Sequence, residues 1–265
     1  MSNILKEISE KRADDVKAMR KDITIGELIT LAKSSPAPRG FAKRIKECVK
    51  EKQTALIAEV KRASPSQGEI RHDFDALETA GKYQLAGATC LSVLTEPHWF
   101  KGHDEYVSNI RAHINLPVLR KDFMVDPYQI IQSREIGADC ILLIMAALSD
   151  DQALELSAAA KEYDLDILVE VHDFAERDRV FNLNMPFDLF GINNRNLKTM
   201  QIDLDTTLKL SRDLPGDVTV VCESGINTVD DIQNMRDHDI YSFLVGTSLM
   251  KQHNIYKATQ NLLGA

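Results

Sequence analysis

A carboxylate and an ammonium group, two residues apart, follow the first apolar run of the chain. The run at residues 55–58 is typical of a buried strand, and Glu59 and Lys61 stand at its carboxyl end. Residues i and i+2 of a strand share a face, so both side chains should point the same way, as groups that transfer protons or bind anions would. An internal ion pair that ends a strand would use the same residues, and the spacing alone leaves both interpretations open.

Ionisable and polar side chains also follow four further apolar runs. Such groups are costly at the ends of buried strands unless they are used. An accident of ion pairing would not favour one end of five runs, whose opposite ends carry mainly turn residues. The groups at the carboxyl ends are, in chain order, Lys121 with Asp122, Glu170, Asn193 with Arg195, and Glu223 with Ser224 and Gly225.

The elements that would position these groups recur from residue 54 onward. Short runs rich in β-branched residues alternate with loops and amphipathic segments, and the continuous apolarity of the runs indicates parallel strands buried on both faces. Eight such units predict a closed (β/α)₈ barrel rather than a doubly wound sheet. The runs are 54–60, 89–94, 116–120, 139–145, 166–171, 187–192, 217–222 and 241–245, and the clearest helical segments are 74–86, 127–136, 150–163 and 228–236.

Residues 1–47 carry apolar positions at helical spacing among many charges. They offer no second core, so we expect a helical extension that caps the barrel and is not an independent domain. The barrel then occupies residues 48–265, and the chain forms one domain.

Two glycine-containing turns follow the last two runs. Ser224 and Gly225 precede one helical segment, and Gly246 and Ser248 begin another. Glycine lets the backbone approach an anion closely, and the N–H groups of a helix N-terminus attract it. Because barrel enzymes often bind phosphate after strands seven and eight, we expect a phosphate site here.

The composition excludes several classes of protein. A net charge of −8 and a pI near 5.4 leave no basic surface for nucleic acid. No apolar run is long enough to span a membrane, and a charged N-terminus argues against a signal peptide, so we expect a cytoplasmic protein. The four cysteines have neither disulfide nor zinc spacing and should be free, mostly buried thiols; no metal site is expected. They are Cys48, Cys90, Cys140 and Cys222.

Six motifs within residues 50–255 together resemble the indole-3-glycerol phosphate synthase family. They are Glu59-Val-Lys61-Arg-Ala-Ser64-Pro-Ser-x-Gly68, Ser92-Val-Leu-Thr95-Glu96 with Phe100 and Gly102, Leu119-Arg-Lys121-Asp122-Phe123 running to Asp126-Pro-Tyr-Gln-Ile130, Gly191-Ile-Asn193-Asn-Arg195, Glu223-Ser-Gly-Ile226, and Gly246-x-Ser248-Leu-Met250.

This resemblance implies a carboxy-lyase of tryptophan biosynthesis that works without a cofactor. Its substrate would be 1-(2-carboxyphenylamino)-1-deoxyribulose 5-phosphate, which closes to indole-3-glycerol phosphate with loss of carbon dioxide and water. The family pattern makes Lys121 the general acid, Glu170 the general base, Glu59 a second essential carboxylate and Lys61 a cationic anchor. Asn193 and Glu223 complete the polar ring.

The resemblance also implies the residues that bind substrate. Ser64, Arg195, Ser224, Gly225, Gly246 and Ser248 would hold the phosphate or lie beside it, with the division of Lys61, Ser64 and Arg195 between carboxylate and phosphate left open. The aromatic ring could lie against Phe100, Phe123, Leu142 and Leu197, although ordinary packing explains each of these almost as well. His172 is interpreted as a structural or solvated residue.

Two other functions use parts of the same residue set. A Schiff-base aldolase would employ Lys121 or Lys61 as an amine nucleophile. A non-catalytic sensor of phosphate ligands would need only the two glycine turns, and the charged groups on the other runs argue against it. We expect a small-molecule substrate, no nucleic-acid or membrane partner and no fused second enzyme domain, with the chain a monomer or a homodimer.

Overall fold

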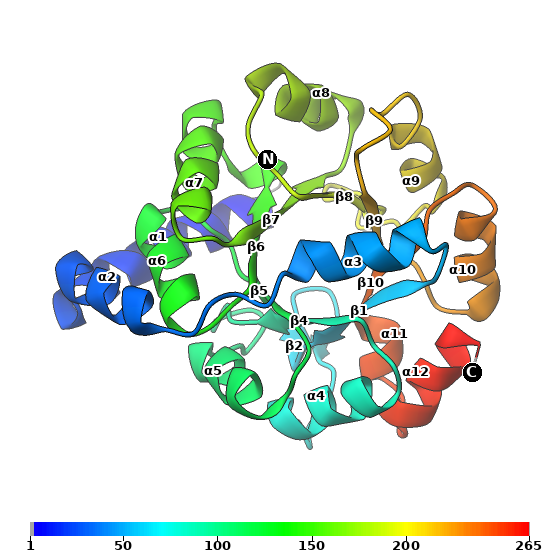
Figure 1. The fold of residues 1–265 in the computed structure, drawn as a ribbon, viewed down its shortest axis with the longest axis horizontal. Helices are drawn as coiled ribbons and strands as arrows, with labels where there is room; N and C mark the ends of the chain where they lie inside the picture. The colour runs from blue at the N-terminus through cyan, green and yellow to red at the C-terminus, as the bar shows by residue number, and fades with distance from the viewer. Residues whose placement is uncertain (1–2, 265) are drawn as a thin grey trace.

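The computed structural model describes residues 3–264, in which eight parallel strands form a closed barrel surrounded by helices (Figure 1). Each strand pairs with the next along the chain, and the last closes on the first. The predicted barrel and its eight strands are confirmed. The strands are β1 (Ala55–Val60), β4 (Cys90–Leu94), β5 (Val118–Lys121), β6 (Cys140–Ile144), β7 (Asp166–Val171), β8 (Leu189–Asn193), β9 (Val220–Glu223) and β10 (Ser242–Val245).

Helices follow the strands, and local sequence fixes where several of them begin. Asp126 caps its helix in a reciprocal capping box with Gln129, and Pro127 fills the first helical position. The four predicted helical segments are confirmed. The barrel helices are α4 (Ala76–Leu85), α5 (Asp104–His113), α6 (Pro127–Glu135), α7 (Asp150–Glu162), α8 (Phe174–Leu183), α9 (Asp205–Leu210), α10 (Val229–Arg236), α11 (Thr247–Met250) and α12 (Ile255–Leu263), with a short 3₁₀ helix at Met145–Ala147.

Strand alternation divides the core into an inner and an outer layer. Ile57 of β1 and Leu168 of β7 belong to one buried cluster inside the barrel. Their neighbours Leu56 and Val169 face outward, where they pack in clusters with the helices. All four cysteines are free, and three are buried while Cys48 is partly exposed.

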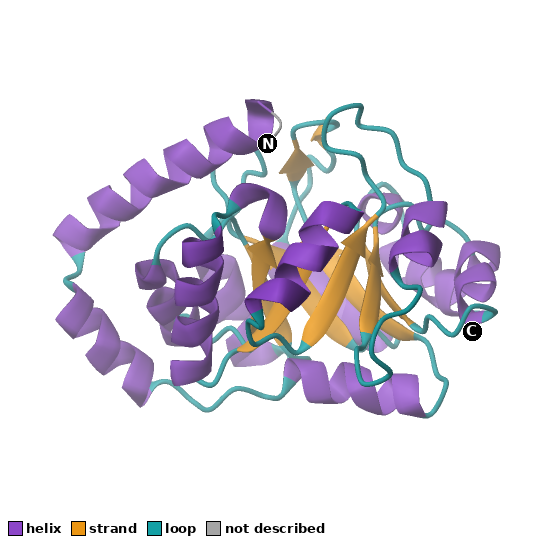
Figure 2. Ribbon diagram, turned by 90° about the horizontal axis from the view of Figure 1, so that it is seen from above, coloured by secondary structure: helices purple, strands orange, loops and turns teal. Residues whose placement is uncertain are grey.

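The N-terminal helices wrap the barrel from one end to the other (Figures 1 and 2). Helix α1 (Asn3–Asp22) begins on the side toward which the strands point, and α2 (Ile25–Ser34) packs on α6. Helix α3 (Phe41–Lys50) crosses the opposite end, where Phe41 and Ile45 join the inner core. The expected boundary between residues 47 and 48 therefore falls inside α3.

A buried ion pair anchors α1 to the barrel. Arg12 donates to both carboxylate oxygens of Asp122, with Nε–Oδ1 3.0 Å and Nη2–Oδ2 2.7 Å. The two side chains are 1% and 0% exposed, and Thr95 and Arg120 also donate to Asp122. Because Asp122 directly follows Lys121, this pair ties α1 to the end of β5.

A small hairpin that the sequence analysis did not foresee follows β1. Strands β2 (Ala63–Ser64) and β3 (Gly68–Glu69) pair antiparallel around the Ser-Pro-Ser turn. Glu69 accepts hydrogen bonds from Arg62 and Lys101, so the hairpin is joined to the loop after β4.

Within residues 3–264, none of the helices is long and apolar enough to cross a membrane.

We propose that residues 1–47 depend on the barrel for their structure, and the Arg12–Asp122 pair offers a test. Arg12→Met leaves a buried carboxylate without its main partner, which costs about 3–5 kcal/mol. Residues 3–34 should then become more susceptible to limited proteolysis while the far-UV circular dichroism of the barrel stays largely intact. Lys17→Met, which removes an exposed ion pair with Asp14, is the control and should change nothing measurable. Unchanged protection in Arg12→Met would contradict the proposal.

Candidate active site

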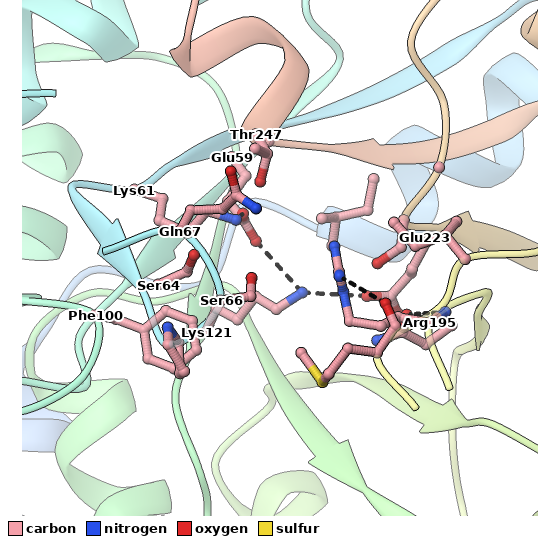
Figure 3. A pocket seen from close by; sticks show the side chains of 18 of the residues that line it. Glu59, Lys61, Ser64, Ser66, Gln67, Phe100, Lys121, Arg195, Glu223 and Thr247 are labelled. Carbon is pink, nitrogen blue, oxygen red and sulfur yellow. Dashed lines mark hydrogen bonds and ion pairs between the residues drawn. The ribbon is translucent and has the colours of Figure 1, made fainter. Parts of the chain in front are cut away.

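A cavity of about 410 Å³ opens where the strands end. Side chains from the carboxyl ends of β1, β5, β7, β8 and β9 line it, together with the loops after β1, β9 and β10 (Figure 3). Parallel strands in a closed barrel bring all their carboxyl ends to one face, which explains how residues from distant parts of the chain meet here.

The structure places fifteen of the sixteen expected site residues on this cavity. They are Glu59, Lys61, Ser64, Phe100, Lys121, Phe123, Glu170, Asn193, Arg195, Leu197, Glu223, Ser224, Gly225, Gly246 and Ser248. Leu142 is the exception, because its side chain is 1% exposed in the inner core and does not line the cavity. It lies two residues before Ile144, the residue of β6 that does reach the cavity.

Lys121 lies between carboxylates from two other strands (Figure 3). Its Nζ is 3.4 Å from Glu59 Oε2 and 3.2 Å from Glu223 Oε2. Glu59 also pairs with Lys61, as the i, i+2 spacing on β1 predicts. The exposed fractions of Glu59, Lys121 and Glu223 are 5%, 18% and 1%, so these charges interact with little screening by water.

Charge pairing sets the protonation of this cluster. Burial by itself would lower the pKa of Lys121, but the charges of Glu223, Glu59 and Glu170 raise it above its ordinary value. Burial would likewise raise the pKa of Glu59, but Lys61 and Lys121 lower it. At neutral pH Lys121 therefore carries a proton and Glu59 carries none.

Glu170 and Glu223 lie close together but differ in protonation. Burial and the charge of Glu170 raise the pKa of Glu223 to about 8, against the opposing effect of Lys121. Burial would also raise the pKa of Glu170, yet His172 and Lys121 lower it to about 2. Two neighbouring carboxyl groups with opposed pKa shifts are typical of sites that transfer protons.

Two glycines leave room for the carboxylates. A Cβ atom at Gly191 would lie 2.3 Å from Glu223 Oε1, and one at Gly246 would lie 2.2 Å from Glu59 Oε1. Both distances are far shorter than a van der Waals contact. Gly246, expected only as a phosphate residue, is therefore also needed for the position of Glu59.

The two turns expected to bind phosphate differ in how their helices begin. Helix α10 is capped by Thr228, which forms a reciprocal capping box with Asp231. Helix α11 has no side-chain cap, and its first two residues, Thr247 and Ser248, line the cavity. Gly225, with φ of +98°, completes the adjoining turn.

Apolar side chains line another part of the cavity. The rings of Phe100 and Phe123 lie with centroids 6.0 Å apart, and Leu197 is nearby on the same cavity. Ile4 and Ile8 of α1 also line it, so the N-terminal helix contributes to the site itself. A surface of this kind suits a planar aromatic group.

The fold also brings to this region several residues that the sequence motifs do not single out as site residues. Ser66, Gln67, Thr247 and Lys251 line the cavity, and Lys251 Nζ donates to Gln67 Oε1 at 2.6 Å. His172 contacts Glu170, with Nε2 3.2 Å from Oε1. The i, i+2 spacing that grouped Glu59 with Lys61 applies equally to Glu170 and His172, and it was the available signal.

The fold is a closed (β/α)₈ barrel, and lysine and glutamate side chains gather in a cavity at the carboxyl ends of its strands. Together these features define the class of barrel enzymes that use acid–base chemistry. The sequence model of the family described as indole-3-glycerol phosphate synthase matches residues 5–262, and the chain belongs to this family. The family expected from the six motifs is confirmed.

Individual relatives agree with this assignment. The chain is 47% identical over 264 residues to indole-3-glycerol phosphate synthase of Zymomonas mobilis subsp. pomaceae, covering 100% of this chain and 99% of that protein. It is 47% identical over 263 residues to the enzyme of the same name from Acinetobacter baumannii strain SDF, covering 99% and 96%. A crystal structure of 3-hexulose-6-phosphate synthase shares the fold, with a TM-score of 0.62, 15% identity and coverage of 79% of this chain and 98% of that one.

Gly191→Ala tests whether the space beside Glu223 matters. The added methyl group must displace the Glu223 carboxylate, and we expect kcat to fall about tenfold or more, since displacements near 1 Å in an active site cost up to about a hundredfold. Steady-state kinetics measure the effect. Gly216→Ala is the control, because a Cβ there meets nothing within 4 Å. Equal activity of both variants would show that the position of Glu223 is not critical.

Proposed function

We propose that this chain catalyses the closure of 1-(2-carboxyphenylamino)-1-deoxyribulose 5-phosphate to indole-3-glycerol phosphate, with release of carbon dioxide and water, as a carboxy-lyase of tryptophan biosynthesis. Membership of the family supports the reaction. The observation that carries the division of roles is the pairing of a protonated Lys121 with an ionised Glu170 on different strands of one cavity.

Lys121 is the proposed general acid. Attack of the aromatic carbon on the ketone builds negative charge on the ketone oxygen, and a proton donor must neutralise it. Lys121 is largely shielded from water, and the surrounding carboxylates hold it protonated and in place. Glu223, with its pKa raised to about 8, is a neutral neighbour near pH 7 that can donate a hydrogen bond within this cluster.

Glu170 is the proposed general base. The dehydration that completes the indole removes a proton from the ring-closed intermediate, and an ionised carboxylate can accept it. Glu170 lies on β7 and Lys121 on β5, so a bound substrate can meet the two groups from different sides. A single group would serve both steps poorly, because one step needs a proton delivered and the other needs one removed.

Cations and backbone N–H groups are proposed to hold the two anionic ends of the substrate. Lys61 and Arg195 line the cavity and can hold the carboxylate until it leaves as carbon dioxide. The uncapped start of α11 and the turn at Ser224 and Gly225 can hold the phosphate. Phe100 and Phe123 would pack against the aromatic ring.

Acid–base catalysis is favoured over a Schiff-base mechanism by the state of Lys121. An amine nucleophile must lose its proton, whereas the surrounding carboxylates raise the pKa of Lys121 above its ordinary value. We further propose a cytoplasmic enzyme that acts alone or as a homodimer on a small molecule. Its free cysteines, three of them buried, fit a reducing compartment.

Substitutions of the two proposed proton-transfer groups test the mechanism. Lys121→Met and Glu170→Gln should each lower kcat by about a hundredfold or more, while substrate binding changes far less. Lys121→Arg should stay strongly impaired, because a guanidinium keeps the charge but rarely releases its proton. Formation of the indole product is followed by ultraviolet absorption or fluorescence. Near-normal kcat in Lys121→Arg would make Lys121 an electrostatic anchor and point to Lys61 as the donor.

Gly225→Ala tests the phosphate site separately from the proton-transfer groups. Alanine is strained at a φ of +98°, and its Cβ would lie 2.8 Å from the side chains of Ile202 and Leu204, so the turn must shift. Loss of hydrogen bonds to a charged phosphate should raise KM about tenfold with little change in kcat. Gly191→Ala, which should mainly lower kcat, provides the contrast. An unchanged KM in folded Gly225→Ala would remove this turn from the phosphate site.

A further inference from the structure

His172 connects the proposed base Glu170 to a second carboxylate on the neighbouring helix. It follows the last residue of β7, and its Nε2 atom lies 3.2 Å from Glu170 Oε1. On the other side of the ring, Nδ1 lies 3.0 Å from Glu176 Oε2 in the first turn of α8. The imidazole is only 7% exposed, so both contacts are largely shielded from water.

The position of the ring is fixed from the side away from the cavity. The backbone N–H of His172 donates to the same Glu176 oxygen at 2.8 Å. Glu176 is itself held near the start of α8, where its N–H donates to the capping residue Asp173. Glu176 can thus orient the imidazole without contact to the cavity, since it is not among the residues that line it.

An imidazole ring between two carboxylates can donate to both of them only when each of its nitrogens carries a hydrogen. Burial would lower the pKa of His172, but Glu170 and Glu176 raise it to about 10. The side chain is therefore an imidazolium near neutral pH, and it presents a positive charge to Glu170.

We infer that His172, held by Glu176, is a positioning residue that keeps Glu170 ionised and oriented for proton abstraction. This inference rests on the proposed role of Glu170 as the general base. It accounts for a histidine whose imidazole is largely shielded from water, that does not itself line the cavity and that has no other part in the proposed mechanism.

The charges that face Glu170 determine the sign of the effect. His172, Lys121 on β5 and the hydrogen bond with Glu223 on β9 favour the ionised form, whereas burial opposes it. Without His172 the effect of burial is offset less completely, and the pKa of Glu170 rises. A general base is inactive when it is protonated. If its pKa is higher, the loss of activity on lowering the pH therefore begins at a higher pH.

Kinetics of His172→Gln provide the test, since glutamine can donate a hydrogen bond but carries no charge. We expect kcat near neutral pH to fall about tenfold with KM nearly unchanged, and the acid limb of kcat to move up by at least about one pH unit. Glu176→Gln should change both in the same direction but less. When Glu170→Gln is already present, adding His172→Gln should lower kcat little further, because both substitutions act through the Glu170 carboxylate.

An activity-independent measurement completes the experiment. Nuclear magnetic resonance of the ¹⁵N-labelled imidazole should give His172 a pKa near 10 in the unaltered enzyme and a lower one in Glu170→Gln and in Glu176→Gln. This titration tests the contact even if His172→Gln does not fold. The control is His113→Gln on α5, an exposed ring that contacts the Asn109 carbonyl, and it should change neither kinetics nor titration of His172.

The outcomes separate this inference from the proposed function. Full activity of Glu170→Gln would overturn the role of Glu170 as base. If Glu170→Gln is impaired but His172→Gln keeps the pH profile and kcat of the unaltered enzyme, the inference about His172 is wrong. An ordinary histidine pKa that does not respond to Glu170→Gln would overturn it equally.

Discussion

The pairing of buried charges at the mouth of the barrel is the constraint on which the site depends. Glu59, Glu170 and Glu223 are almost completely buried, and each would be costly as an isolated anion. Lys121 compensates them from the centre of the cluster, within 3.4 Å of two of the three. The fold must therefore keep these groups in contact, because a buried charge that loses its partner is far more costly than an exposed one.

Several features away from the reacting groups meet this demand. Gly191 and Gly246 leave the space that the carboxylates of Glu223 and Glu59 occupy. The buried Arg12–Asp122 pair fixes the residue after Lys121 and joins α1 to the barrel. The N-terminal segment is thus part of the same structural unit as the cavity, which also receives side chains from α1.

The charge cluster also explains how one cavity can hold an acid and a base together. Because Glu170 and Glu223 are neighbours, both cannot be ionised cheaply, and their surroundings decide which one keeps the proton. His172 and Lys121 favour the anion at Glu170, so the pKa of Glu223 rises instead. The result is an ionised carboxylate beside a neutral one and an ammonium, which are the forms that successive proton transfers require.

The sequence alone determined the barrel, because runs of buried residues and the units between them are local patterns with a definite period. It also determined which strand ends carry Lys121 and Glu170, since parallel strands in a barrel share one functional face. Depth within the barrel was decided only by the tertiary structure: Leu142 shares a face with Ile144 but lies one layer deeper, inside the core. The Arg12–Asp122 pair spans 110 positions, and the opposed protonation of Glu170 and Glu223 depends on burial and neighbours from other strands. Such contacts and electrostatic fields arise only when distant segments pack together, and local sequence patterns carry no record of them.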